Sequence, residues 1–195
     1  YLAELPIGNM PSDIAEAVSD NLFLFRNPAK GNGFCYVQVY HPGVEGRGKY
    51  TSWIHLDNGE WTFGQPDKMP LYGAEELSAE CYRIFIHEGP KAAHRVKRKS
   101  ENSEHPWAAE LQGTHIGWPG GTNRHNRADW GKLDVLHRDT EIVVVADNDE
   151  VGLVAAREIA ERHLTRFNRV RILRFPASYE EGYDLADEWP ERAPS

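Results

Sequence analysis

The sequence predicts an α/β protein built on a mainly parallel sheet, preceded by a small antiparallel α+β unit. From residue 81 onward, short strands alternate with helical segments. These strands are almost continuously apolar, which is typical of a parallel sheet covered on both faces. The first 80 residues differ, because Gly, Pro and Asn-Gly turn signals separate their strands. We therefore expect two domains, residues 1–80 and 81–195.

The expected elements of the first domain are one helix and a group of antiparallel strands. Residues 11–18 can begin a helix, with Pro11 in its first turn. Asn58-Gly59 is a strong signal for a hairpin between two neighbouring strands. The strand segments, rich in aromatic and β-branched residues, are 21–28, 33–42 and 49–64.

The expected elements of the second domain are four strands of a parallel sheet and the helices between them. The strands are expected within residues 82–89, 113–121, 141–149 and 169–176. The helices are expected at residues 90–99, 127–136 and 151–164. The third strand is the clearest, because Val143 to Ala146 are uninterrupted apolar residues. In the last helix, one side carries Val151, Val154, Ala155, Ile159 and Leu164.

Composition narrows the class of protein. A hydrophobic content of 40% supports a packed core, and a net charge of −8 argues against binding nucleic acid through a uniformly positive surface. Cys35 and Cys81 are the only cysteines and form no C-x-x-C motif, which suits a reducing compartment. No apolar run is long enough to span a membrane. We expect a cytoplasmic protein without a membrane partner, and, since the sequence opens at Tyr1, a part of a longer chain.

Acidic residues follow two of the predicted parallel strands. Glu88 ends the first strand, and Asp147 and Asp149 follow the third. Ligands collect at the carboxyl ends of parallel strands, and residues two apart in extended backbone point to the same side. If the two strands are neighbours, three carboxylates converge and raise one another's pKa unless a hard cation such as Mg²⁺ lies between them. The alternative for Asp149 and Glu150 is that they cap the following helix.

These motifs resemble the Toprim domain of bacterial primases, topoisomerases and some nucleases, over residues 82–189. The family motifs are a strand-end Glu-Gly, here Glu88-Gly89, and an Asp-x-Asp with a following Gly, here Asp147, Asp149 and Gly152. The sequence is most similar to the primases of phages, plasmids and integrated elements. That similarity is carried by Glu88-Gly89-Pro90-Lys91, by Pro119-Gly120-Gly121, and by the tail Gly182, Asp184, Asp187 and Trp189.

The resemblance implies a Toprim, Rossmann-like fold and the catalytic part of a DNA primase or primase-helicase. Such an enzyme makes RNA primers from NTPs on a single-stranded DNA template, by metal-dependent nucleotidyl transfer. Glu88, Asp147 and Asp149 would be catalytic and, with Asp184, would hold Mg²⁺ or Mn²⁺. Asp184 is the candidate for one further metal-binding carboxylate, because Ala92 stands where cellular primases have an Asp. The alternatives are a Toprim nuclease or topoisomerase, and a degenerate module that binds nucleic acid without catalysis.

Basic residues and glycines near these acids are candidates for contacts with nucleotide or nucleic acid. The basic residues of the first helix have a solvated helix face as their alternative. The Gly-rich segment permits close approach of the backbone to a phosphate, and its alternative is an ordinary loop after a strand. The candidates are Lys91, Arg95, Lys97, Arg98, Gly120, Gly121, Arg124 and Arg127.

We expect no zinc in this fragment. Six of the nine His residues fall between His87 and His137, but no pair has the spacing of helical metal ligands and no Cys accompanies them. His87, next to Glu88, is expected to contact a nucleotide or a metal-binding residue rather than to bind metal itself.

Overall fold

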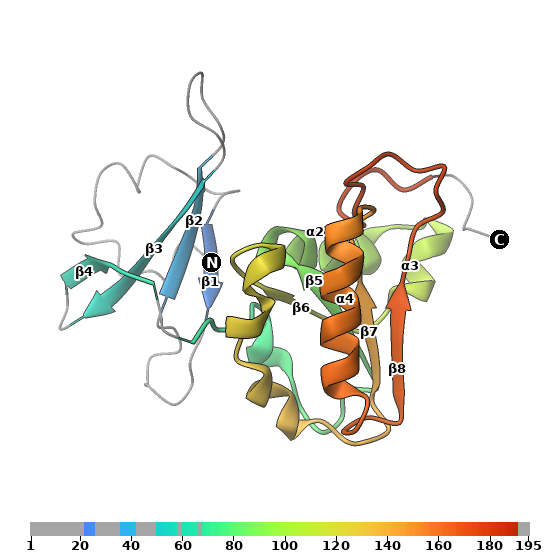
Figure 1. The fold of residues 1–195 in the computed structure, drawn as a ribbon, viewed down its shortest axis with the longest axis horizontal. Helices are drawn as coiled ribbons and strands as arrows, with labels where there is room; N and C mark the ends of the chain where they lie inside the picture. The colour runs from blue at the N-terminus through green and yellow to red at the C-terminus, as the bar shows by residue number, and fades with distance from the viewer. Residues whose placement is uncertain (1–21, 26–35, 42–49, 58–59, 66–67, 191–195) are drawn as a thin grey trace. The chain divides into compact units, whose positions relative to one another are not determined.

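The computed structural model describes residues 22–25, 36–41, 50–57, 60–65 and 68–190. The chain divides into two compact units, Tyr1–Asp67 and Lys68–Ser195 (Figure 1). The division lies between residues 67 and 68, whereas the sequence predicts it between residues 80 and 81. Residues 68–80 belong with the second unit because their backbone pairs with it: Tyr72 and Gly117 exchange two hydrogen bonds, of 2.9 and 3.1 Å.

The described part of the first unit is an antiparallel sheet of four strands. Its order, β1-β2-β3-β4, follows the order of the chain, as short connections between antiparallel neighbours favour. The antiparallel strands predicted for this unit are thereby confirmed. The predicted helix at residues 11–18 and the Asn58-Gly59 turn lie outside the described residues. The strands are β1 (Leu22–Phe25), β2 (Tyr36–His41), β3 (Tyr50–Asp57) and β4 (Glu60–Phe63).

The second unit is built on a parallel sheet of four strands, which confirms the predicted α/β fold class. The strand order is β6-β5-β7-β8, so that β5 and β7 are the two central strands. All three pairs are parallel, and all four strands therefore end at the same edge of the sheet. The strands are β5 (Arg83–Glu88), β6 (Thr114–Trp118), β7 (Glu141–Val145) and β8 (Arg169–Leu173).

Helices cover both faces of this sheet. Helices α2 (Gly89–Asn102) and α3 (Pro106–Glu110) cover one face, where Phe85, Val96 and Trp107 are buried together. Helix α4 (Glu150–His163) covers the other face, where it packs on Ile86 and Val144. Since side chains alternate along a strand, each central strand contributes to both apolar clusters. The remaining helices are the 3-10 segments η3 (Ala74–Glu76), η4 (Thr122–Arg127) and η5 (Trp130–Val135).

Two helical expectations need correction. The helix predicted at residues 127–136 is present only as the short 3-10 helix η5, and α3 and η4 were not predicted. On α4, Val151, Val154 and Leu164 share the side that the sequence marks as apolar, but they are exposed. The buried residues are Gly152, Ala155, Ala156, Ile159, Ala160 and His163. Four of these six residues are Gly or Ala, whose small size lets α4 pack closely on the sheet.

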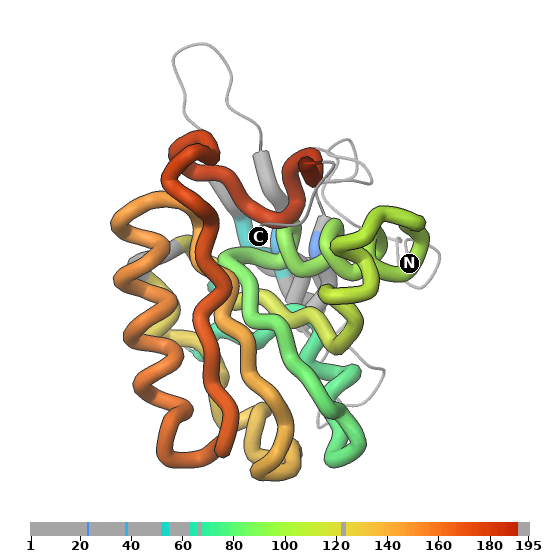
Figure 2. Tube along the Cα trace, turned by 90° about the vertical axis from the view of Figure 1, so that its right-hand side faces the viewer, coloured from blue at the N-terminus to red at the C-terminus, as the bar shows by residue number. Residues whose placement is uncertain are grey.

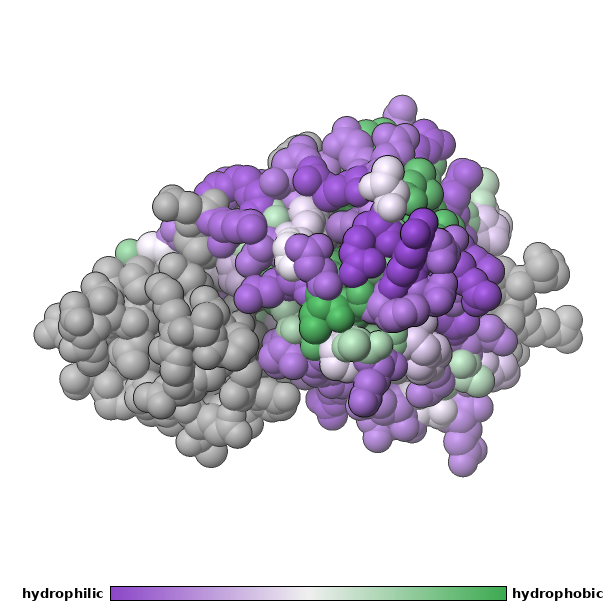
Figure 3. All heavy atoms as spheres, turned by 90° about the horizontal axis from the view of Figure 1, so that it is seen from below, coloured by the Kyte–Doolittle hydropathy of each residue, from purple (hydrophilic) through white to green (hydrophobic). Residues whose placement is uncertain are grey.

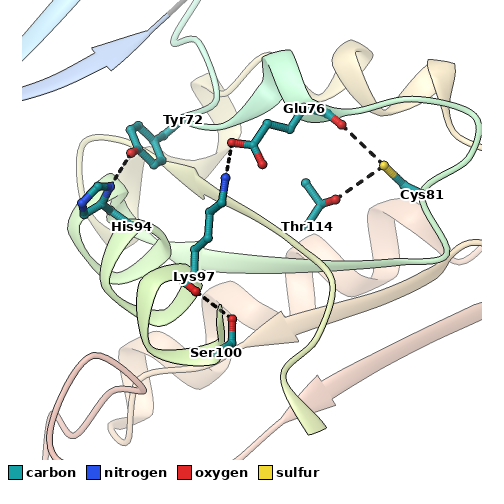
Figure 4. A network of polar contacts seen from close by, with 7 residues as sticks. All are labelled: Tyr72, Glu76, Cys81, His94, Lys97, Ser100 and Thr114. Carbon is teal, nitrogen blue, oxygen red and sulfur yellow. Dashed lines mark hydrogen bonds and ion pairs between the residues drawn. The ribbon is translucent and has the colours of Figure 1, made fainter. Parts of the chain in front are cut away.

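The segment before β5 covers the outer edge of β6. Figure 4 shows how polar contacts hold this segment against α2: the Tyr72 hydroxyl lies 2.8 Å from His94 Nδ1, and Lys97 Nζ lies 2.6 Å from Glu76 Oε1. Nearby, Cys81 Sγ lies 3.5 Å from Thr114 Oγ1 on β6. An edge strand with unpaired backbone groups invites association with other chains, and this cover removes that edge over part of β6.

The surface at the other end of the second unit, where the strands begin, is mostly hydrophilic around a small apolar area (Figure 3). None of the helices in the described part of the chain is long and apolar enough to cross a membrane. The acids described next lie at the opposite edge, where the strands end.

Gly117 is a test of how tightly this fold is packed. A Cβ at this position would lie 2.4 Å from the carbonyl oxygen of Gly89, where β5 turns into α2. We expect Gly117→Ala to lower the free energy of unfolding by about 1–3 kcal/mol, since backbone has to move to relieve the overlap. Urea unfolding measures the change. Gly131→Ala is the matched control, because its Cβ would meet nothing nearer than 3.5 Å. Equal effects of the two substitutions would contradict the packing described.

Candidate metal and catalytic site at the carboxyl edge of the sheet

The two central strands bring Glu88 and Asp147 to the same edge of the sheet. Strands β5 and β7 pair in parallel, with Ile86 opposite Val144, so both strands end side by side. The apolar run of β7 stays buried through Ala146, and Asp147 follows it while still only partly exposed. The sequence left open whether these two strands are neighbours; the structure shows that they are, and they place the two acids together.

The surroundings of Asp147 shift its pKa far from the usual range of a carboxyl group. Burial raises the pKa of its carboxyl from 3.8 to about 8, and the negative charges of Glu88, Asp184, Asp149 and Asp187 add to the rise. Like charges that share a partly desolvated volume disfavour ionisation of one another. Five acids therefore interact at this edge, where the sequence predicted four. Asp187 was missed as a site residue, although it belongs to the tail motif.

Asp149 caps the helix that follows. Its backbone is extended, and its Oδ1 accepts a hydrogen bond of 2.6 Å from the backbone N–H of Gly152. This satisfies one of the unpaired donors in the first turn of α4. The capping alternative is thus confirmed for Asp149, whereas its role as a metal ligand stays a prediction. Glu150 is the first residue of α4 and is exposed.

Gly152 explains why a glycine follows the two aspartates. A Cβ at Gly152 would lie 3.0 Å from the carbonyl oxygen of Asp147 and 3.1 Å from its Cβ. Contacts this close are rarely tolerated, so the first turn of α4 can approach Asp147 only because residue 152 lacks a side chain. The glycine therefore sets the distance between the helix and the acid at the strand end.

Asn148, between the two aspartates, anchors the segment that carries Asp184. Its side-chain amide donates hydrogen bonds to the carbonyl oxygens of Tyr179 and Glu180, at 3.0 and 2.9 Å. Its backbone exchanges hydrogen bonds with Tyr183 and Gly182, at 2.9 and 3.0 Å. Sequence reasoning missed this residue, because an Asn between two acids gives no sign of a partner more than 30 positions away.

Residues 176–190 pass over the strand ends (Figure 2), and Asp184 lies in a tight turn of this segment. Its Oδ1 accepts a hydrogen bond from the backbone N–H of Ala186, and its own N–H donates to Asp187 Oδ2 at 3.0 Å. Burial raises the pKa of Asp184, and the positive charge of Lys91 opposes that rise. Lys91, on the first turn of α2, therefore lies within electrostatic range of the acids.

The other predicted basic residues on α2 do not act as one group. Lys97 pairs with Glu76, as Figure 4 shows, and it faces the segment before β5. Arg95 and Arg98 are exposed. The positive charge of Arg95 contributes to lowering the pKa of Lys99. Any contact of Arg95, Lys97 or Arg98 with nucleic acid stays a prediction.

The Gly-rich loop after β6 lies beside Glu88. Gly120 and Gly121 have φ values of 97° and 77°, in the region that favours glycine. A Cβ on Gly121 would lie 4.0 Å from Glu88 Oε1, and one on Gly120 would overlap the side chain of Arg124 at 2.9 Å. Arg127 is exposed at the end of η4. The loop thus brings the backbone of Gly121 next to one of the predicted acids, Glu88.

The expectation for His87 is wrong. Its side chain is 1% exposed and points to the opposite face of β5 from Glu88, as alternation along a strand requires. There its Nε2 lies 2.9 Å from His115 Nδ1, and His115 Nε2 lies 2.9 Å from the carbonyl oxygen of Leu111. Burial lowers the pKa of both imidazoles, so this pair is a neutral part of the core.

The acids fit a hard divalent cation by their chemistry, because they are oxygen donors whose mutual repulsion a cation would relieve. They do not form a closed ligand set. Among the described residues, no group of three or more His, Cys, Asp or Glu side chains is close enough together to hold a metal ion. The acids at this edge of the sheet are therefore close enough to affect the pKa of one another, but not close enough to coordinate one metal ion together.

No known family model matches this chain, and no curated protein matches it. One similar solved structure is the primase fragment of the bacteriophage T7 primase-helicase, with 16% identity, a TM-score of 0.44, and 77% of this chain and 60% of that chain covered. Another is bacteriophage T7 lagging-strand DNA polymerase with primase domains of two gp4 subunits bound to an RNA/DNA hybrid and dTTP. Its identity is 16%, its TM-score 0.45, and the coverage 75% and 68%.

The raised pKa of Asp147 predicts how stability depends on pH. The folded chain holds a proton on Asp147 up to about pH 8, whereas the unfolded chain releases it near pH 4. The free energy of unfolding therefore falls as the pH rises through that window. We expect Asp147→Asn to remove this fall and to be more stable than wild type at pH 8, by about 1–3 kcal/mol, while matching it near pH 4.

Urea unfolding in EDTA, at a series of pH values, measures this difference. Glu161→Gln is the control, because Glu161 is exposed on α4 and loses the same charge. A wild-type pH slope that persists in Asp147→Asn would contradict the assignment of the titration to Asp147.

Proposed function

We propose that this chain is the Toprim catalytic part of a DNA primase, which makes RNA primers from NTPs on a single-stranded DNA template. The observation that carries the proposal is the partly buried Asp147 at the end of a central parallel strand, with Glu88, Asp149, Asp184 and Asp187 near enough to raise its pKa. An acid cluster of this kind costs stability unless it serves a cation. The resemblance of the sequence motifs to Toprim domains suggests that such a cation would serve nucleotidyl transfer.

Glu88, Asp147 and Asp184 are the residues that would hold Mg²⁺ or Mn²⁺, with Asp149 joining through the oxygen that it does not use as a cap. The bound cation would supply charge stabilisation on the triphosphate and on the attacking and leaving oxygens. Mounting the acids on strand ends keeps their separation fixed. Ala92 is buried in α2, 5% exposed, so a carboxylate at that position would be buried as well. Asp184 would take over that negative charge.

The remaining parts of the site would bind the substrates. Lys91 lies within range of Asp184, where an ammonium would also attract a phosphate. The backbone of Gly120 and Gly121 would approach the triphosphate, with Gly121 beside Glu88, and Arg124 and Arg127 would add charge. The proposed setting is the cytoplasm of a cell that hosts a phage or mobile element, within a longer primase or primase-helicase.

A second candidate function is a Toprim module that binds nucleic acid without catalysis. The observation in its favour is that no three acidic or metal-ligating side chains in the described part of the chain are within metal-binding distance of one another. Asp149 already serves as a helix cap, and Ala92 replaces a further acid. The two experiments below separate this function from the first.

The first experiment measures metal binding. We expect Mg²⁺ or Mn²⁺ to bind wild type and to raise its melting temperature at pH 8, because the cation neutralises the clustered carboxylates. Asp147→Asn should weaken binding at least about tenfold, and Glu161→Gln should leave it unchanged. Calorimetric titration gives the affinities. If wild type binds no divalent cation, the non-catalytic function replaces the proposed one.

The second experiment measures primer synthesis. Single-stranded DNA, NTPs and Mn²⁺ are incubated with wild type, Asp147→Asn or Glu161→Gln, within the full-length parent protein. We expect template-dependent oligoribonucleotides from wild type and Glu161→Gln, and a loss on the order of 100-fold or more in Asp147→Asn. Nicking of supercoiled DNA without NTPs would favour a nuclease or topoisomerase instead. An active parent whose product does not depend on Asp147 would refute the proposal.

A further inference from the structure

The acid site is assembled from two parts of the chain, and one of them has anchors of its own. Strands β5 and β7 supply Glu88 and Asp147. The C-terminal strap, defined as residues 176–190, supplies Asp184 and Asp187 and passes over the strand ends (Figure 2). We propose that Lys99 on α2 and Asn148 at the end of β7 are positioning residues that hold the strap so that Asp184 faces Asp147. The part of this inference that concerns metal rests on the proposed function.

Lys99, on α2, contacts the strap through hydrogen bonds and an aromatic ring. Its Nζ donates hydrogen bonds to the carbonyl oxygens of Leu185, at 3.4 Å, and of Asp187. The same ammonium lies 4.2 Å from the centre of the Trp189 ring, within the range of a cation–π interaction. One side chain thus contacts three residues of the strap, more than 80 positions further along the chain.

The charge of Lys99 is embedded among the strap acids. Burial lowers the pKa of its ammonium, and the carboxylates of Asp184, Asp187 and Glu188 oppose that shift. Removing the ammonium would take a donor from the carbonyl oxygens of Leu185 and Asp187, of which that of Leu185 keeps Trp189 Nε1, and would take the positive charge of Lys99 from three acids of the strap. Both losses act on the strap turn that carries Asp184.

Asn148, just after β7, forms hydrogen bonds with the strap. Two hydrogen bonds from its side-chain amide and two through its backbone bind residues 179–183. Because Asn148 lies between Asp147 and Asp149, the strap is fastened to the same stretch of backbone that carries the strand-end acids. The distance from Asp184 to Asp147 is therefore set over a short path rather than through the whole domain.

Between the two anchors, the strap is a small folded turn. Asp184 and Asp187 are joined by hydrogen bonds of 3.0 and 3.2 Å through their backbone and the Asp187 carboxylate. Leu185 and Trp189 are buried, and Trp189 Nε1 donates to the carbonyl oxygen of Leu185 at 2.7 Å. These apolar contacts hold the strap against the domain, but apolar packing is not directional and does not fix the orientation of Asp184. The directed contacts that orient Asp184 come from Lys99 and Asn148.

Metal affinity distinguishes positioning from a purely electrostatic role. A positive charge near the acids repels a cation, so its removal alone would tighten metal binding. Loosening the strap would instead take Asp184 away and weaken binding. The two roles of Lys99 therefore predict opposite changes when its charge is removed.

The test uses Lys99→Met, Asn148→Ala and the conservative Lys99→Arg. The control is Lys132→Met, which makes the same substitution on η5, at the other face of the sheet. Hydrogen exchange at residues 184–189 is expected to become about tenfold faster in the first two variants, with α4 unchanged. Mn²⁺ affinity, measured by calorimetry, should fall about fivefold or more in both. Lys99→Arg should restore both quantities, and Lys132→Met should alter neither.

Each result decides the inference. Unchanged exchange in the strap of both Lys99→Met and Asn148→Ala would overturn it. Equal or tighter Mn²⁺ binding by Lys99→Met would show that Lys99 acts through its charge, and the positioning role would be wrong. If wild type binds no Mn²⁺, the proposed function fails on its own account, and the exchange measurement still decides whether the two residues hold the strap.

Discussion

The second unit depends on one constraint, a carboxylate held partly buried at the end of a central parallel strand. Asp147 follows an apolar strand that is buried throughout, and its pKa is raised to about 8 by burial and by four neighbouring acids. Such a group opposes folding above pH 4 unless something compensates it. The Asp149 cap, the missing side chain at Gly152 and the Asn148 anchor all fix backbone around this one residue.

The order of the strands fixes Glu88 beside the partly buried Asp147. Because β5 and β7 are adjacent, Glu88 and Asp147 cannot move apart without breaking the centre of the sheet. Asp184 is different, since it lies on a segment without regular secondary structure that is held by side-chain contacts. The site therefore joins a rigid half on the strands to a half that directed hydrogen bonds keep in place. A rigid mount fixes the positions of Glu88 and Asp147, whereas the position of the strap depends on its side-chain contacts.

A net charge of −8 does not argue against the proposed action on nucleic acid. Negative charge at a cation site attracts divalent ions, which in turn attract phosphate, so the overall charge is a poor guide to the partner. Basic groups are placed locally: Lys91 near Asp184, and Arg124 over the Gly-rich loop beside Glu88. The pairing of Lys97 with Glu76 shows that not every basic residue on α2 is available to a ligand.

The sequence by itself determined the elements and their chemistry. Aromatic and β-branched segments between turn residues located the strands of the first unit, and nearly continuous apolar runs located those of the second. The strand-end acids marked the edge that carries the candidate site. Only the tertiary structure decided which strands are neighbours, that Asp149 caps α4, and that His87 turns into the core. It alone brought Lys99 and Asn148 to the strap, because contacts between residues that far apart arise from packing. Local patterns encode secondary structure, whereas long-range partners depend on how all the elements fold together.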